Sequence, residues 1–322
     1  MRISYSLGSL LSINEILDCS RILQNKNPDT VWIPETWGME NFSMLSMISQ
    51  NIQSKIGSSI INIYSRSPAL ISMGAVTVDT ISNGRLIIGL GTSSPAIVED
   101  FHGYAFEKPL ARMREYVELV RKITTGDKIM YDGEFFHLKG FSLLTKPIRS
   151  KIPIYLAAVN KKMVELAWEI SDGVIFYLRP LNELKETISK MQTKRKIDTT
   201  CQIITAVSED SEEAIQRVKT TIAFYVSVGK VYREFLAKNG FSTETGNIYE
   251  EFKKTGFKSN SELVTQQMID ALTIYGTPEE CKKKLEKFRD TGIDLPIIQF
   301  NPIGNAVESF KLVTNTFSGD ES

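Results

Sequence analysis

The side chains best suited to chemistry follow short apolar runs that are typical of buried strands. Glu35 comes directly after the run at residues 30–33, within the sequence VWIPETW. A carboxyl group buried against Trp32 and Trp37 would have a raised pKa and could transfer a proton. A structural carboxylate that accepts backbone N–H groups explains the same position equally well. Glu35 is therefore our candidate catalytic residue, with both interpretations open.

Small and polar residues follow the next two predicted strands. Asn62 ends the apolar run 55–62, and Arg66 after it could bind an anion or brace a loop. Gly89, Gly91 and Thr92 follow the run 86–88, but the third glycine of a dinucleotide-binding fingerprint is missing. A turn at the strand end is therefore favoured over a Rossmann site, although such glycines could also let a planar ligand approach the backbone.

A further group of residues could bind phosphate. Ala157, Ala158 and Val159 lead from a predicted strand into a helix that begins near Lys161. The free N–H groups of a helix N-terminus can bind an anion. Arg179, just after the following strand, could add a positive charge.

The composition disfavours several function classes. The chain has 38 basic and 38 acidic residues, which disfavours nucleic acid as a partner. It has no HExxH motif and no GxxxxGK loop, and His102 and His137 are its only histidines. Cys19, Cys201 and Cys281 show no metal-site or disulfide spacing. No signal peptide and no apolar run of about 20 residues is evident. We therefore expect a cytoplasmic protein without a membrane segment, and a site role for His102 stays open.

The segment 55–95 predicts a strand, a helix and a parallel strand. Pro68 would open the helix and Asn83-Gly84 would end it. Ala69, Met73, Val76 and Ile81 have the spacing of its buried face. Small and polar residues beyond the carboxyl ends of such strands are typical of ligand sites in α/β proteins.

The whole chain repeats this strand–helix pattern eight times, which predicts a single TIM (β/α)8 barrel over residues 1–322. A doubly wound open sheet is the alternative. Asp132-Gly133 indicates a hairpin excursion at 128–145. Residues 229–275 are helix-prone and would form a helical insertion before the last strand. The predicted strands are 2–7, 30–33, 55–62, 86–88, 153–158, 174–178, 201–207 and 295–300.

Several motifs, in this order along the chain, resemble the bacterial-luciferase-like flavin oxidoreductases. They are SSIINIYSRSPALISMGAVTVDTISNGRLIIGLG, YDGEFFHLKGF, IPIYLAAVNKKMVELAWEISDGVIF and YGTPEECKKKLEKFRDTGID. The chain looks most like the branch that uses coenzyme F420, a deazaflavin, and within it the archaeal methylene-tetrahydromethanopterin reductases. The resemblance implies a TIM barrel, usually a homodimer, with the deazaflavin or FMN across its C-terminal mouth. It places a bulge with a non-proline cis peptide under the ring at Ser59-Ile60, and the phosphate near Ala157 and Ala158.

The same resemblance implies hydride transfer between the deazaflavin and a small organic substrate, such as a C1-pterin. Two positions depart from the reductases. They carry an Asp-His pair where this chain has Glu35-Thr36, and a glutamate thought to relay a proton where it has Ser6. Two alternatives stay open: an FMN-dependent monooxygenase, and a flavin-binding protein without catalysis.

Overall fold

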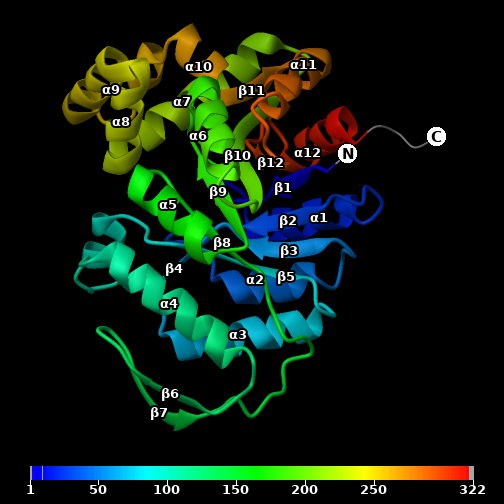
Figure 1. Ribbon diagram of the computed structural model, residues 1–322. Helices are drawn as coiled ribbons and strands as arrows, with labels where there is room; N and C mark the ends of the chain where they lie inside the picture. Colours follow the sequence, from blue (N-terminus) through cyan, green and yellow to red (C-terminus); the bar gives the residue numbers. More distant parts are fainter. Residues whose placement is uncertain (1, 9, 319–322) are drawn as a thin grey trace. The chain divides into compact units, whose positions relative to one another are not determined.

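The computed structural model describes residues 2–8 and 10–318, which form two compact units. One unit is continuous and spans Asp29 to Ile175. The other joins the chain up to Pro28 to the chain from Phe176 onward. Each unit contains parallel strands with helices packed against them (Figure 1). Among the described residues, no helix is both long and apolar enough to cross a bilayer, and no group of side chains could hold a metal ion.

In the continuous unit, the strand order is β2-β3-β5-β8-β9, with β4 paired to β5, and all these pairs are parallel. The strands are β2 (Thr30–Ile33), β3 (Lys55–Ser58), β4 (Ile61–Asn62), β5 (Leu86–Gly91), β8 (Ile154–Ala157) and β9 (Gly173–Tyr177), which runs on past the unit boundary. The helices are α2 (Asn41–Ile48), α3 (Pro68–Ile81), the π-helix η1 (Ile97–Phe101), α4 (Pro109–Ile123) and α5 (Lys161–Ile170).

The other unit has the strand order β11-β10-β12-β1, again all parallel. These strands are β1 (Ser4–Ser6), β10 (Asp198–Val207), β11 (Thr273–Gly276) and β12 (Leu295–Phe300). The helices of this unit are α1 (Ile13–Leu23), α6 (Leu181–Gln192), α7 (Ser211–Val228), α8 (Lys230–Leu236), η2 (Ala237–Phe241), α9 (Ser242–Thr255), η3 (Asn260–Leu263), α10 (Gln266–Leu272), α11 (Pro278–Arg289) and α12 (Ala306–Phe317).

Capping residues set the helix boundaries. Ser12 and Thr277 each form a capping box, and Pro278 occupies the first position of α11. The N-cap of α7 is Asp210, whose carboxylate accepts the Glu212 N–H.

The helical insertion ends earlier than residue 275. The helices of this segment stop at Leu272, and Thr273–Gly276 form β11 instead. Register pairs this strand with residues 204–207 of β10. The segment TIYG contains β-branched and aromatic residues, which favour a strand. Its backbone groups form hydrogen bonds with the neighbouring strand β10.

The predicted buried face of α3 is wrong in three of its four residues. Val76 is buried, but Ala69 is exposed, and Met73 and Ile81 are 54% and 44% exposed. The helix is apolar around most of its circumference, so periodicity alone could not identify the inner face. The buried face instead carries Ile71, Ala75 and Val78. Gly74 lies where α2 packs against α3, because a Cβ there would lie 2.5 Å from the Phe42 ring.

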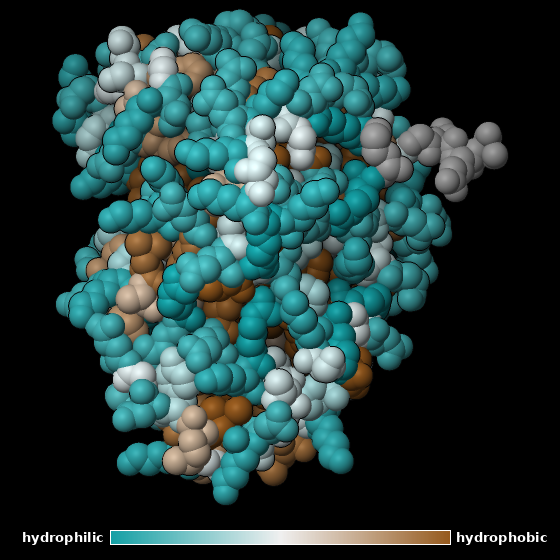
Figure 2. Space-filling model, viewed as in Figure 1, coloured by the Kyte–Doolittle hydropathy of each residue, from teal (hydrophilic) through white to brown (hydrophobic). Residues whose placement is uncertain are grey.

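A hairpin of β6 (Ile129–Asp132) and β7 (His137–Phe141) lies within the segment 128–145, and its strands are antiparallel. Apolar side chains gather at this end of the continuous unit (Figure 2), and Phe141 is 80% exposed. The Glu115 carboxylate of α4 is buried and accepts the N–H groups of Glu134, Phe135 and Phe136 at 2.8–3.2 Å. These bonds attach the hairpin turn to α4.

Asp172 connects several elements of the continuous unit. Its carboxylate accepts from Lys151 Nζ at 2.5 Å, Arg121 Nη2 at 2.9 Å and the Ile154 N–H at 3.0 Å. Burial alone would raise the pKa of this carboxyl, but the bonds from Lys151, Ile154 and Arg121 outweigh it and lower the pKa below the ordinary value.

Candidate active site

The site begins where β3 breaks. After Ser58 the backbone turns through a cis peptide bond between Ser59 and Ile60, then resumes as β4. The predicted position of this bond is therefore confirmed. Backbone hydrogen bonds join the segment to its neighbours: Ser59 N–H to Ile33 O at 2.9 Å, and Glu35 N–H to Ile60 O at 3.3 Å. The ends of β2 and β3 are thereby fixed against each other.

Gly89 and Gly91 pack directly against this segment. A Cβ on Gly89 would lie 1.9 Å from the Ser58 carbonyl oxygen. A Cβ on Gly91 would lie 2.5 Å from the Ile60 side chain and 3.5 Å from Ala157 Cβ. The protein itself therefore takes up the space that the sequence appeared to leave for a ring. The two glycines bring β5 into contact with the cis segment.

Two polar atoms in this region are buried without a hydrogen-bond partner among the described residues, Ser59 Oγ and Asn62 Nδ2. The amide orientation of Asn62 is set by its other atom, because Oδ1 accepts the Tyr64 N–H at 2.9 Å. Ser59, Ile60 and Thr92 are themselves half-buried. The end of the sheet thus presents a free amide donor and a free hydroxyl beside a partly accessible surface.

Glu35 is held by Arg66. The guanidinium donates to both carboxylate oxygens, at 2.5 and 2.6 Å, and the Asn41 N–H donates to Oε2 at 3.0 Å. Arg66 also bonds Glu40, and its carbonyl accepts the Tyr116 hydroxyl. Burial would lower the pKa of the Arg66 guanidinium, but these carboxylates raise it above its ordinary value.

These contacts match the structural interpretation that the sequence left open for both residues. Glu35 accepts a backbone N–H, and Arg66 braces the loop after β2 against the loop after β4. Its role as a catalytic group stays a prediction.

The predicted phosphate site lies where β8 leads into α5. Ala157 is half-buried and Ala158 is buried. Asn160 caps α5 by accepting the Met163 N–H at 3.0 Å. The first turn carries Lys161 and no acidic residue, so this helix end has a positive field that suits an anion. Val159 precedes the N-cap Asn160, so its backbone lies next to the N-terminus of α5.

Arg179 is placed differently from what the sequence suggests. Its side chain is 2% exposed, and Nη1 bonds Glu183 at 2.7 Å and Thr187 at 3.2 Å. The guanidinium carbon also lies 4.5 and 4.7 Å from the ring centres of Phe176 and Phe235. Burial lowers the pKa of this guanidinium despite Glu183. Arg179 therefore already has an anionic partner of its own, and phosphate binding by it stays a prediction.

Sequence analysis missed two polar side chains in the unit that holds β1, Gln202 of β10 and Gln299 of β12. They lie on the same sheet face as Ser6 of β1, which the resemblance had already singled out. The signal was present, because CQIITAV and LPIIQF each place one glutamine inside an apolar run. A buried glutamine in such a strand is uncommon and marks a polar function or a polar partner.

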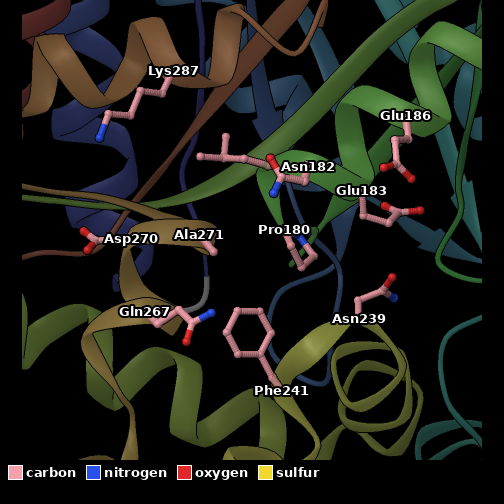
Figure 3. Close-up of a pocket in the computed structure, with 11 residues that line it drawn as sticks. Pro180, Asn182, Glu183, Glu186, Asn239, Phe241, Gln267, Asp270, Ala271 and Lys287 are labelled. Atoms are coloured by element: carbon pink, nitrogen blue, oxygen red, sulfur yellow. The ribbon is translucent and has the colours of Figure 1, made fainter.

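The same unit has a pocket of about 810 Å³ at the ends of α6 and α10 (Figure 3). None of the predicted site residues lines it. Its polar lining includes Asn182, Glu183, Glu186, Asp270 and Lys287, and Phe241 supplies an aromatic wall. Glu183 is engaged by Arg179, so this pocket is shaped by an existing ion pair.

Comparison with known proteins identifies the family to which this chain belongs. The model of the family described as luciferase-like monooxygenase matches residues 2–295. The 5,10-methylenetetrahydromethanopterin reductase of Archaeoglobus fulgidus is 30% identical over 299 residues, covering 88% of each protein. A putative coenzyme F420-dependent oxidoreductase of Mycobacterium tuberculosis is 29% identical over 300 residues, covering 84% of this chain and 86% of its own length.

A solved structure supplies the fold. The coenzyme F420-dependent tetrahydromethanopterin reductase of Methanopyrus kandleri matches with a TM-score of 0.86 at 22% identity, over 98% of both chains. The predicted TIM barrel and the predicted resemblance to the F420-dependent branch are confirmed, and the open-sheet alternative is wrong. The chain belongs to the luciferase-like monooxygenase family and has its TIM-barrel fold.

Proposed function

We propose that this chain is a coenzyme F420-dependent oxidoreductase that transfers a hydride between the deazaflavin and a small organic substrate. The names of its relatives support this assignment. One observation of this chain carries it: Ser59 Oγ and Asn62 Nδ2 are buried without partners at the strand ends. Leaving such an atom unpaired costs about 1–3 kcal/mol, so a ligand that pairs with both would be favoured.

The residues present fit such a cofactor. A donor at Asn62 and a hydroxyl at Ser59 suit the carbonyl groups on the edge of a deazaflavin or flavin ring. The Ile60 side chain, which packs over Gly91, supplies an apolar backing, and the N-terminus of α5 suits a phosphate. When bound, the deazaflavin supplies a ring carbon that accepts or delivers hydride.

The remaining chemistry belongs to the chain. The cis segment is held on both sides by backbone hydrogen bonds, so it would position the ring and shield one face from water. Arg66 keeps Glu35 in place, and Glu35 in turn bonds the segment through its N–H. We propose that Glu35 positions the cis segment, because its carboxylate already accepts hydrogen bonds from Arg66 and from the Asn41 N–H.

The substrate that we propose is a reduced pterin carrying a one-carbon unit, as in the relatives' names. We also propose that the working form is a homodimer. The outward face of α3 supports an interface, since Leu70, Met73 and Ile81 are 52%, 54% and 44% exposed along one stripe.

Fluorescence titration of the purified chain with coenzyme F420 and, separately, with FMN tests the cofactor. We expect F420 to bind more tightly. Asn62→Asp keeps the oxygen that accepts from Tyr64 but removes the donor, so its Kd for F420 should rise at least about fivefold. Asn315→Asp, an exposed change on α12, is the matched control and should leave the Kd unchanged.

Tighter binding of FMN would refute the proposal and favour the FMN-dependent monooxygenase. F420 binding without turnover of any electron acceptor would favour a flavin-binding protein without catalysis.

A further inference from the structure

The pocket formed by α6, η2, α10 and α11 has the size and the lining of a second binding site (Figure 3). Its lining residues run from Pro180 to Lys287, so all of them belong to one unit of the chain. Its volume of about 810 Å³ lies within the range of pockets that bind small molecules. The side chains around it therefore indicate which ligand it would accept.

A break in the helical backbone shapes the wall at η2. Asn239 and Gly240 leave helical geometry, and Gly240 has a φ of 98°, which glycine adopts without strain. The Asn239 Nδ2 donates to the Phe235 carbonyl at 2.8 Å, which fixes the orientation of the amide. The break brings both Asn239 and Phe241 to the pocket. Irregular helical turns of this kind are frequent at functional sites.

Three charged side chains line the pocket without an ion-pair partner. Among residues 2–8 and 10–318, no oppositely charged group lies within 4.0 Å of Glu186, Asp270 or Lys287. The fourth charged residue, Glu183, is already paired with Arg179 at 2.7 Å. The unpaired charges are therefore two carboxylates and one ammonium group, and a ligand with one net positive charge would complement them.

These charges lie at two sides of the pocket. Figure 3 shows Lys287 and Asp270 on one side and Glu186 on the other. The Asp270 carboxylate is held in place, because it accepts the Tyr275 hydroxyl at 2.6 Å and the Gln266 amide at 3.1 Å. A carboxylate oxygen has two lone pairs, so each can accept a further donor. One side of the pocket thus suits a zwitterion, and the other suits a cation.

Polar amides and apolar surface lie between the two sides. The Asn182 and Gln267 amides form no hydrogen bond within the described part of the chain, and each can both donate and accept. Leu181, Ala271 and the Phe241 ring supply apolar surface. A chain of methylene groups with polar ends would fit this middle section.

We propose that this pocket binds an α-amino acid with a positively charged side chain, of the arginine and lysine class. The α-carboxylate pairs with Lys287, the α-ammonium group with Asp270, and the side-chain cation with Glu186. The methylene groups of the ligand lie along the apolar surface. A phosphate or nucleotide would meet two unpaired carboxylates and only one lysine, which disfavours it. This inference does not depend on the proposed oxidoreductase activity.

Isothermal titration calorimetry of the full chain with three matched ligands tests the pocket. They are L-arginine, L-citrulline, which has an uncharged urea group in place of the guanidinium, and agmatine, which lacks the carboxylate. We expect arginine to bind about fivefold more tightly than either of the others, the effect of one ion pair in an open pocket.

Two variants assign the charges to their partners. Glu186→Gln should remove the preference for arginine over citrulline, and Lys287→Gln should remove the preference for arginine over agmatine. Lys190→Gln, an exposed change on α6 outside the pocket, is the control and should retain both preferences. Each preference is a ratio of Kd values within one protein, so a loss of stability cannot imitate the result.

No binding of arginine by the wild type, or equal Kd values for the three ligands, would overturn the inference. Retention of both preferences in Glu186→Gln and Lys287→Gln would overturn it as well. The F420 titration is a separate measurement. A chain that binds arginine selectively but fails to bind F420 supports this inference and refutes only the proposed function.

Discussion

The ion pair between Arg66 and Glu35 gives the sharpest stability prediction. The two side chains are 11% and 12% exposed, so neither charge is well solvated. Arg66→Met removes two of the three hydrogen bonds to the Glu35 carboxylate and leaves only the Asn41 N–H. Breaking a buried pair from one side costs about 3–5 kcal/mol. We take about 3 kcal/mol, because both groups keep some contact with water.

A double-mutant cycle separates the charge from the shape of the site. Arg66→Met combined with Glu35→Gln leaves no unpaired charge, and the amide oxygen can still accept the Asn41 N–H. The double variant should therefore lose only about 1 kcal/mol, less than Arg66→Met alone.

Urea unfolding followed by far-UV circular dichroism measures all four proteins, and thermal unfolding should show a Tm about 4 °C lower for Arg66→Met. Because Glu35 N–H bonds Ile60 O, the single variant should also bind F420 more weakly. A loss below about 1 kcal/mol in Arg66→Met, or a double variant as unstable as the sum of the singles, would refute the reasoning.

Three further outcomes can be checked. Gly91→Ala should weaken F420 binding and lower the free energy of unfolding by about 1–3 kcal/mol, because its Cβ would overlap the Ile60 side chain. Gly246→Ala, in open space on α9, should instead raise that free energy by about 0.5–1 kcal/mol. Equal changes in stability for the two variants would contradict this reasoning. The lowered pKa of Asp172 adds stability above the unfolded carboxyl's pKa of about 3.9 that is lost as pH falls through the folded pKa. Urea midpoints should therefore fall more steeply from pH 5 to 3 in wild type than in Asp172→Asn, and parallel curves would disprove it. Met73→Glu should convert the proposed dimer to a monomer in sedimentation experiments, and an unchanged mass would exclude this face as the interface.

The elements that the sequence predicts best are those with local boundary signals. The predicted bounds of β2 and β12 and the predicted start of α5 match the structure, because a polar cap or the ends of a short apolar run mark each of them. Such signals depend on neighbouring residues only, so they can be read without knowing the fold.

The features that the sequence could not predict depend on distant partners. The sequence suggested that Arg179 adds a positive charge at a phosphate site. Its actual partners, Glu183 and Phe235, come together with it only when α6 and α8 are packed, so the sequence alone could not show them. The absence of side chains at Gly89 and Gly91 suggested space for a ligand, but the Ser58 carbonyl group and the Ile60 side chain occupy that space. Gln202 and Gln299 were overlooked because a strand is predicted from its apolar run, and a single polar residue does not change that prediction.

The pairing of β1 with β12 has a consequence for synthesis of the protein. Ser4 is in register with Ile297, so β1 can pair with β12 only when nearly the last strand of the chain has been made. At about 5–20 residues per second, a ribosome needs roughly 15–60 s to produce the intervening segment. Throughout this time β1 lacks β12, whereas the contiguous unit from Asp29 to Ile175 is complete about halfway through translation. A nascent chain halted before β12 should therefore hold the unit Asp29–Ile175 folded while the other unit is still incomplete.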